Sequence, residues 1–510
     1  MSDTQSPADI PKLEGLTFVL AAVFIALSNF LAVMNMTVAN VALPTIAGDL
    51  GISTSQGNWV ITFYAVAEAI TVPLTGWLSA RYGSARVFSI SFLVFGVASA
   101  LCGLSSTLPM LVCARMLQGF SGGLLMPLSQ ILLLRIFPDS KATLATAVWS
   151  MTTLVAPVVG PILGGYLCDN YSWGWAFLID LPFALVGSLV IASILWHSLP
   201  ATGAKGIDKV GLLLLVFWVS SLQVMLDEGK DKDWFASTEI CLLLIAAVVG
   251  FVAFMIWELT EEHPVIDLRV FKHRGYAAAV LTLMITFGAF FGLNVLIPQW
   301  LQFNMGYTAT WSGRTVAWMG VFAVLCAPLV AGVTGKIDAR LLTFIGVGWL
   351  GVVTLWLSFS NNDMTYWDVA LPFLFIGVGL PMFMVPLNAI ALSCVEDSEM
   401  EGAAGIMNFL RTLGGAFSTS LTTTAWENAI RYNRAELVGI ANPAVVNAAS
   451  PDASSGELMR NVFSLMIDGQ SVMLATNHVL FTLSTVLFLA AATIWLAPRM
   501  QRVVDTSKVH

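Results

Sequence analysis

Three ionisable side chains occur in stretches of the sequence that are otherwise apolar. Glu68 lies in "FYAVAEAI", Asp180 in "FLIDLPFA" and Arg115 in "CARMLQGFSGG". A charge within an apolar membrane segment is costly, so such residues mark proton, ion or substrate pathways by default. A carboxyl group can bind and release a proton, and a nearby cation changes the balance between its two forms. Glu68, Asp180 and Arg115 are therefore the candidates for proton coupling.

Glu68 is the leading candidate for the proton carrier. It lies about eleven residues into the second apolar segment, which places it near the middle of a bilayer about 30 Å thick. Asp180 lies about six residues into the sixth segment, at a depth that matches Arg115. Other acids, Asp227, Glu258 and the stretch 396–401, fall at segment edges and are expected to be solvated or at headgroup level.

Two neutral amides accompany these charges. Gln118 follows Arg115 by three residues, so both share one face of a helix. Asn35, in "MNMTVANVALP", cannot titrate, but its amide must find hydrogen-bond partners in apolar surroundings. We predict that Asn35, Gln118 and Glu68 line a substrate cavity. The alternative for Arg115 is a side chain that extends to the outer headgroups.

A glycine- and arginine-containing turn follows the second segment. In "LTGWLSARYGSARVF", Gly76 and Gly83 let the chain reverse and let two helices approach. Arg81 and Arg86 can cap helix ends or pair with acids. The alternative is that these arginines only anchor the loop on the cytoplasmic side.

Two further features have a conformational interpretation. Gly160 and Gly164 have the spacing that lets helices pack closely, and Gly165 extends this small surface. Pro161 removes a backbone hydrogen bond, so this helix can bend or can seal the contact between two halves. The alternative is a purely structural packing site. Arg411 lies deep in the thirteenth segment and is expected to face a cavity or an acid.

The composition places the chain in the membrane. Of its 510 residues, 57% are hydrophobic and 11% are charged, with a mean hydropathy of +0.82. No basic cluster suggests nucleic acid, and the six cysteines lack the spacing of a metal or disulfide site. No nucleophile–base pair and no phosphate-binding loop is found. We expect neither an enzyme nor a cofactor.

The apolar segments predict fourteen transmembrane helices, since each needs about 20 apolar residues. They cover residues 16–40, 57–79, 87–106, 109–134, 142–167, 174–196, 209–227, 238–259, 276–303, 313–335, 340–360, 366–393, 403–426 and 477–497.

The loop charges orient these helices. With both termini in the cytoplasm, fifteen Lys and Arg residues lie inside and five lie outside, and cytoplasmic loops are usually the basic ones. The segment 427–476 is then a long periplasmic loop. It is either a tolerated insertion or a docking surface for a partner.

The turn at 74–88 is repeated at 330–344, "VAGVTGKIDARLLTF". This offset pairs segments 1–6 with 9–14 and leaves 7–8 as an inserted hairpin, which is the plan of an alternating-access transporter. We predict an all-α membrane protein with two six-helix bundles plus a two-helix insertion. Its parts are a cytoplasmic tail (1–15), an N-terminal bundle (16–200), the hairpin (201–262), a C-terminal bundle (263–500) and a second cytoplasmic tail (501–510).

Several motifs together resemble one family. They are TVANVALPTIAGDLG, QGNWVITFYAVAEAI, RMLQGFSGGLLMPLSQ, WSMTTLVAPVVGPILGGYLCDNYSWGW, LDEGKDKDWF, HPVIDLRVF, GYTATWSG and NFLRTLGGAFSTSLTTT. The chain resembles the fourteen-helix drug:proton antiporters of the major facilitator superfamily over nearly its whole length.

The resemblance implies roles for particular residues. The family usually has an aspartate at the position of Asn35 and a neutral residue at that of Glu68, so a carboxylate has moved between helices. The sixth helix of the superfamily is an outer support helix, which implies that Asp180 is a structural partner. Arg115 is implied in proton handling and the turn after the second helix in latching one conformation. The usual aspartate of that turn is replaced by Ala80.

The resemblance also implies the activity. We expect an antiporter of the bacterial inner membrane, surrounded by lipid, that exports small amphipathic drugs with the proton gradient as its energy source. Its expected partners are a periplasmic adaptor and an outer-membrane channel. The alternative is an exporter or facilitator of one metabolite or fatty acid, without proton exchange.

Overall fold

The described part of the chain is helical throughout. The computed structural model describes residues 13–52, 54–138, 141–196, 208–229, 232–262, 264–334, 336–396, 399–440 and 453–498. Within these ranges the chain forms α-helices and short 3-10 helices, and no strand. Most of the two predicted tails, residues 1–12 and 501–510, lies outside the described residues.

The helices follow the predicted segments closely. In chain order they are α1 (Gly15–Leu50), α2 (Thr54–Thr71), η1 (Val72–Leu74), α3 (Thr75–Tyr82), α4 (Ser84–Gly103), α5 (Leu108–Ile136), α6 (Ala142–Asn170), α7 (Trp175–Leu178), α8 (Asp180–Leu195), α9 (Lys209–Glu228), η3 (Trp234–Ala236), α10 (Thr238–Thr260), η4 (Leu268–Lys272), α11 (Arg274–Phe303), α12 (Ala309–Thr334), α13 (Ala339–Leu357), α14 (Tyr366–Ser393), α15 (Met400–Ile440), α17 (Ala453–Thr493) and η5 (Ile494–Leu496).

Local sequence explains several helix ends. The side chains of Asp208 and Asp338 accept backbone N–H groups at the starts of α9 and α13. Thr365 and Asp368 form a capping box at the start of α14. Gly83 ends α3 with a φ of 90°, a conformation that favours glycine, and so turns the chain into α4.

The number of spans is the first difference from the sequence expectation. Twelve described helices are long and apolar enough to cross a membrane, and a bent pair in α6 raises the number to 13. The two parts of α6, Ala142–Pro157 and Val159–Cys168, meet at 41°. The predicted span 403–426 lies within α15, which is helical but not among these candidates. Its Ser- and Thr-rich stretch "STSLTTT" lowers its hydropathy.

The described parts of the predicted loop 427–476 are helical. Residues 427–440 continue α15 and residues 453–476 belong to α17. A helix of 41 residues is about 60 Å long, twice the thickness of the hydrocarbon core. The position of this segment outside the membrane stays a prediction.

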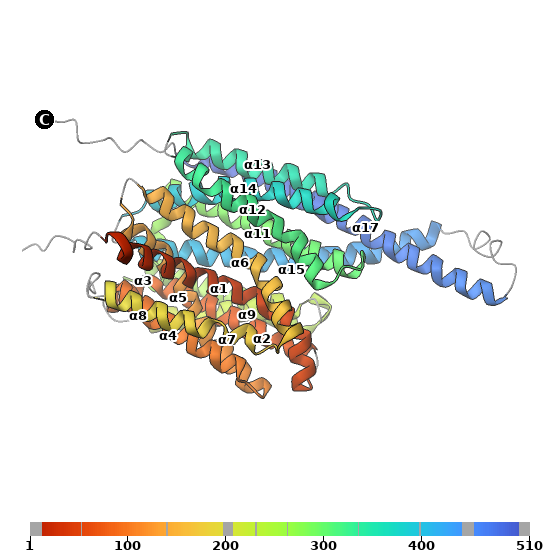
Figure 1. Cartoon of the computed structure of the whole chain (residues 1–510), viewed down its shortest axis with the longest axis horizontal. Helices are drawn as coiled ribbons and strands as arrows, with labels where there is room; N and C mark the ends of the chain where they lie inside the picture. Colours follow the sequence, from red (N-terminus) through yellow and green to blue (C-terminus); the bar gives the residue numbers. More distant parts are fainter. Residues whose placement is uncertain are drawn as a thin grey trace, which may run out of the picture.

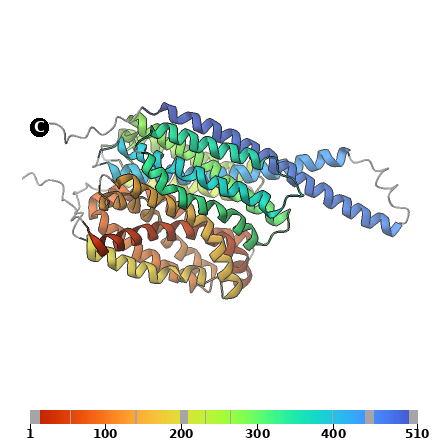
Figure 2. The ribbon, with the colours of Figure 1, turned by 45° about the horizontal axis from the view of Figure 1, so that its top comes forward.

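The helices form an elongated bundle from which α15 and α17 project. The early helices, from red to yellow, lie along one side and the later helices, from green to blue, along the other (Figure 1, Figure 2). We call the end at which α1 begins the terminal end. α15 and α17 project from the opposite end (Figure 1). α9 and α10 pack on each other, and α9 also contacts α2 and α15, one from each side.

Glycines bring α2 and α5 into close contact. A side chain at Gly119 would collide with the backbone carbonyl of Tyr64, and one at Gly123 would lie 2.8 Å from the carbonyl oxygen of Glu68. Gly122 faces the hydroxyl group of Tyr64 and the ring of Phe95. Small residues permit this approach in membranes, where packing drives helix association. The contact places the functional faces of α2 and α5 against each other.

We predict that Gly119→Ala destabilises the protein by about 1–3 kcal/mol, because backbone atoms rather than a flexible side chain must move. Gly348→Ala is the matched control, since nothing lies within 4 Å of its added methyl group. The measurement is thermal unfolding in detergent. Equal transition temperatures for the two variants would contradict the prediction.

Candidate functional site

A chain of hydrogen bonds joins four helices within the bundle. Nη1 of Arg115 donates to Oε1 of Gln118 at 2.6 Å, and Nε2 of Gln118 donates to Oδ1 of Asn35 at 3.0 Å and to Oγ of Ser99 at 2.5 Å. Asn35 Nδ2 and Ser99 Oγ both donate to Oδ2 of Asp180, each at 2.6 Å. All five side chains have 0% exposure. A buried cation and a buried acid are thus connected through neutral groups.

Arg115 has further contacts that stabilise its charge. Its Nε donates to the carbonyl oxygen of Val60 at 3.1 Å. Its guanidinium carbon lies 4.0 Å from the ring centre of Tyr64 and 5.5 Å from that of Phe177. Aromatic faces attract cations, and more strongly when both are desolvated. Arg115 therefore lies inside the bundle and does not extend to the headgroups.

The structure brings Asn35, Gln118, Arg115 and Asp180 together. Glu68 lies apart from them, on α2. Asn35 and Gln118 are fully buried and bonded to each other in this conformation. Their assignment to a substrate cavity stays a prediction.

Glu68 is fully buried near the middle of α2–α3. Neither of its carboxyl oxygens has a hydrogen-bond partner in the part of the chain that the structure describes. A buried carboxylate that accepts no hydrogen bond is expensive to keep in an apolar interior.

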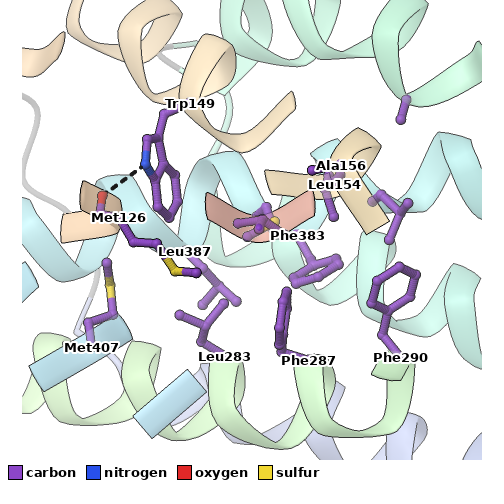
Figure 3. Close-up of a cluster of buried hydrophobic side chains, with 14 of the residues drawn as sticks. Met126, Trp149, Leu154, Ala156, Leu283, Phe287, Phe290, Phe383, Leu387 and Met407 are labelled. Atoms are coloured by element: carbon purple, nitrogen blue, oxygen red, sulfur yellow. Dashed lines mark hydrogen bonds between the residues drawn. The ribbon is translucent and has the colours of Figure 1, made fainter. Parts of the chain in front are cut away.

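Arg411 lies between the two sides of the bundle. Its Nη2 is 3.3 Å from the sulfur atom of Met126, and its guanidinium carbon is 5.3 Å from the ring of Trp149 and 4.9 Å from that of Phe287. Met126 and Trp149 come from α5 and α6, and Phe287 from α11. Figure 3 shows these three side chains within one apolar cluster, with the indole N–H of Trp149 bonded to the carbonyl oxygen of Met126 at 3.2 Å. Arg411 thus has both sides of the bundle as neighbours.

Three buried amides also connect the two sides. Gln130 of α5 donates to Oδ1 of Asn388 on α14 at 2.9 Å, and Asn408 of α15 donates to Oε1 of Gln130 at 3.1 Å. The three side chains are at most 1% exposed. Sequence reasoning missed this group, although amides in otherwise apolar segments are its signal.

An ion pair joins the two sides at the terminal end. Arg135 of α5 pairs with Glu401 of α15, and Ser84 of α4 donates to the same carboxylate at 3.1 Å. Beside them, a side chain at Gly76 would meet the backbone of Gly402 at 2.8 Å. α3 and the start of α4 therefore contact α15 directly.

The expectation that the edge acids are solvated is wrong for two of them. Glu401 is only 12% exposed and is paired across the bundle. Glu258 is 3% exposed and accepts the backbone N–H of Ile266 at 3.0 Å. Position at a segment edge does not reveal what a neighbouring helix contributes.

The other predicted motif residues have identified neighbours. Arg86 donates through Nε to the carbonyl oxygen of Trp196 at 3.2 Å and lies over its ring, while Arg81 lies in the last turn of α3.

The glycine surface of α6 packs on α1 of the same side. Side chains at Gly160 and Gly164 would meet Thr37 and Val38 of α1, and Gly165 faces Val41. Pro161 lies inside α6, just beyond its 41° bend. α6 also contacts α12 of the other side. The role of these residues in conformational change stays a prediction.

Among the described residues, no group of three His, Cys, Asp or Glu side chains could hold a metal ion.

The model of the Major Facilitator Superfamily matches residues 25–419. The multidrug export protein EmrB of Escherichia coli K12 is 39% identical over 492 residues, which cover 95% of this chain and 96% of that protein. EmrB of Haemophilus influenzae is 43% identical over 439 residues, 86% of each chain. The fatty acid resistance protein FarB of Neisseria gonorrhoeae is 37% identical over 496 residues, 96% of this chain and 98% of that protein.

A solved structure is similar in fold. The proton:xylose symporter XylE gives a TM-score of 0.57 at 16% identity, covering 95% of this chain and 97% of that one. At this identity the likeness shows the fold alone.

We predict that Arg135 and Glu401 are energetically coupled by about 1 kcal/mol, because the pair is partly buried. The measurement is a double-mutant cycle on thermal unfolding with Arg135→Gln, Glu401→Gln and both. The matched control is Arg434–Asp468, an exposed pair with an N–O distance of 2.6 Å that joins α15 to α17 on one side. Coupling no larger than in the control would contradict a role in holding the two sides together.

Proposed function

The chain belongs to the Major Facilitator Superfamily, and on that premise we propose that it exports amphipathic compounds in exchange for protons. The observation that carries the proposal is the set of four buried ionisable side chains, Glu68, Arg115, Asp180 and Arg411, inside a chain similar to multidrug exporters over nearly its full length. The family consists of transporters, so we propose no enzymatic chemistry, and we propose the proton gradient as the energy source in place of a cofactor.

The proposed topology has fourteen spans, with α15 as the span that hydropathy alone does not identify. α1 to α8 then form the N-terminal bundle, α11 to α17 the C-terminal bundle, and α9 and α10 the inserted hairpin. The contacts of α9 with both α2 and α15 support an insertion that lies along the junction of the bundles. We place the chain in the bacterial inner membrane with the terminal end in the cytoplasm, as the loop charges indicate.

Alternating access requires that contacts at one end form while those at the other open. The Arg135–Glu401 pair and the Gly76–Gly402 contact close the terminal end in this conformation. We propose that this is the outward-facing state, and that the turn containing Gly76 stabilises it. The bend in α6 and its glycine contact with α1 would let that helix adapt when the bundles rotate.

The apolar cluster around Arg411 suits varied substrates. Its methionine and aromatic side chains come from both bundles and are packed together in this conformation (Figure 3). Methionine and aromatic side chains can repack around different apolar ligands. We propose that amphipathic drugs bind as these side chains separate, with Asn35 and Gln118 as polar neighbours on the periplasmic side.

A narrower substrate range is the second candidate function. FarB, a fatty acid resistance protein, is as similar to this chain over its length as a probable multidrug resistance protein, EmrY, at 37% identity each. An exporter of a single amphipathic acid without proton exchange would fit the same apolar cluster. Substrate competition and proton release distinguish the two.

The projecting helices are the proposed docking surface for a periplasmic adaptor, which in turn would reach an outer-membrane channel. Beyond the bilayer they expose Tyr432, Leu465 and Met466, each more than 60% accessible. Isolated exposed apolar residues are ordinary, but these lie on a two-helix extension with no other cover among the described residues. The two helices are linked by the ion pair between Arg434 and Asp468.

We predict that purified protein in proteoliposomes accumulates an amphipathic dye only when an imposed pH gradient supplies protons for exchange. Collapse of the gradient with a protonophore should abolish accumulation, because no other energy source is proposed. Liposomes without protein are the control. Equal uptake with and without the gradient would support the facilitator and contradict the antiporter.

We predict that replacing Tyr432, Leu465 and Met466 together by Gln removes drug resistance in cells and leaves transport in proteoliposomes unchanged. The reason is that we propose these exposed side chains as contacts of the adaptor and not as part of the transport pathway. Glu436→Gln, on the same exposed extension, is the control that should retain resistance. Full resistance in the triple variant would contradict the docking surface.

A further inference from the structure

Asn35 and Asp180 form a matched pair across α1 and α8. Their side chains have the same shape and differ only in one terminal group, an amide nitrogen in Asn35 and an oxygen in Asp180. The two ends meet at 2.6 Å, with Nδ2 of Asn35 donating to Oδ2 of Asp180, although the residues are 145 positions apart. Both are fully buried.

The surroundings of the pair provide a place for one proton. Oδ2 of Asp180 accepts two donors, from Asn35 and Ser99, which stabilise the carboxylate. Oδ1 of Asp180 has no hydrogen-bond partner in the described chain. A proton on Oδ1 would leave both accepted hydrogen bonds in place, so the site can hold either form with the same geometry.

Charged and titratable groups approach Asp180 from each neighbouring helix. Arg115 of α5 is connected to it through Gln118 and Asn35 or Ser99. The ring of Tyr64 on α2 lies 4.0 Å from the guanidinium carbon of Arg115, and Cys102 of α4 donates through its sulfur to Oε1 of Gln118 at 3.7 Å. Glu68 differs, because no donor from the described residues approaches its carboxyl oxygens.

We propose that the Asn35–Asp180 pair is the proton-binding site, with Asp180 supplying the carboxyl group. The assignment deepens the proposed proton antiport and depends on it. It differs from the sequence expectation, which gave the proton to Glu68 and a structural role to Asp180. The pair also connects the proton to Arg115, because Asn35 and Ser99 both accept from Gln118, and Gln118 accepts from the guanidinium.

The pair should work with its two members exchanged. In Asn35→Asp/Asp180→Asn, the new aspartate on α1 can still accept from Gln118, and the amide nitrogen of the new asparagine on α8 can donate to it. Oδ2 of Asp180 accepts from both Asn35 and Ser99 in the unmodified protein, so the hydroxyl group of Ser99 must turn to the amide oxygen of the new asparagine. The donation from Asn35 to the carbonyl oxygen of Leu31 has no replacement. The exchange moves the carboxyl group from one helix to the other and preserves the connection to Arg115.

The test is substrate-induced proton release from the purified full-length protein in weakly buffered detergent solution, with thermal unfolding to confirm folding. We expect Asp180→Asn to lose release and the exchanged double variant to regain it. Asp363→Asn, the same chemical change at an exposed residue between α13 and α14, is the control that should keep release. Thermal unfolding separates the two roles. Proton binding at Asp180 predicts that Asp180→Asn loses release without a matching loss of thermal stability, whereas a merely structural role predicts that release and stability fall together.

Three outcomes overturn the assignment. The first is that Asp180→Asn still releases protons. The second is that the double variant folds but releases none. The third is that Glu68→Gln loses proton release while Asp180→Asn retains it. The last result returns the proton to Glu68 and leaves the proposed antiport intact. Absence of release from the unmodified protein, together with gradient-independent uptake, would instead contradict the antiport itself.

Discussion

The buried guanidinium of Arg115 is the constraint on which the arrangement of the early helices depends. A cation without exposure to water must receive acceptors and a compensating charge from within the bundle. Val60 and Gln118 supply acceptors, Tyr64 supplies an aromatic face, and the amides carry the connection on to Asp180. These partners come from several helices, so each must lie at a particular depth and rotation. The glycines of α5 permit this, because they bring the backbone of α2 within contact of α5 at Tyr64 and Glu68.

The junction between the two sides of the bundle follows a different principle. Its described polar contacts are amide pairs, one partly buried ion pair and a guanidinium that lies over aromatic rings. Interhelical hydrogen bonds in membranes contribute only about 0.6 kcal/mol each on average. Contacts of this size fix the orientation of two rigid bodies, yet a ligand with modest differential affinity can separate them. The early helices are stabilised as one body, whereas the junction can exchange partners.

Hydropathy predicted the positions of the spans, because a helix that crosses the lipid needs a run of about 20 apolar residues, and such runs are visible in the sequence. Hydropathy alone did not reveal that α15 continues as one helix to Ile440, because the outer part of this helix is rich in polar and charged residues. The candidate site was predicted by residue type but not by pairing. Arg115 and Gln118 could be placed together because they share a helical turn, whereas the contact of Asn35 with Asp180 depends on how α1 and α8 pack. The same limit applies to the three buried amides of the junction. In the sequence each is an isolated amide, and only the packing of three helices brings Gln130, Asn388 and Asn408 together.

The Asn35–Asp180 contact changes how a missing acid in a helix should be interpreted. A neutral amide at a position expected to titrate suggests that the charge was lost or moved to another site in the bundle. Here the amide remains bonded to a carboxyl group of the same size, within the same hydrogen-bond chain to Arg115. The contact needs one carboxyl group and one amide group, and it does not specify which of the two helices carries the acid. Glu68 has a separate position, fully buried on α2, where no hydrogen-bond donor among the described residues reaches its carboxyl oxygens.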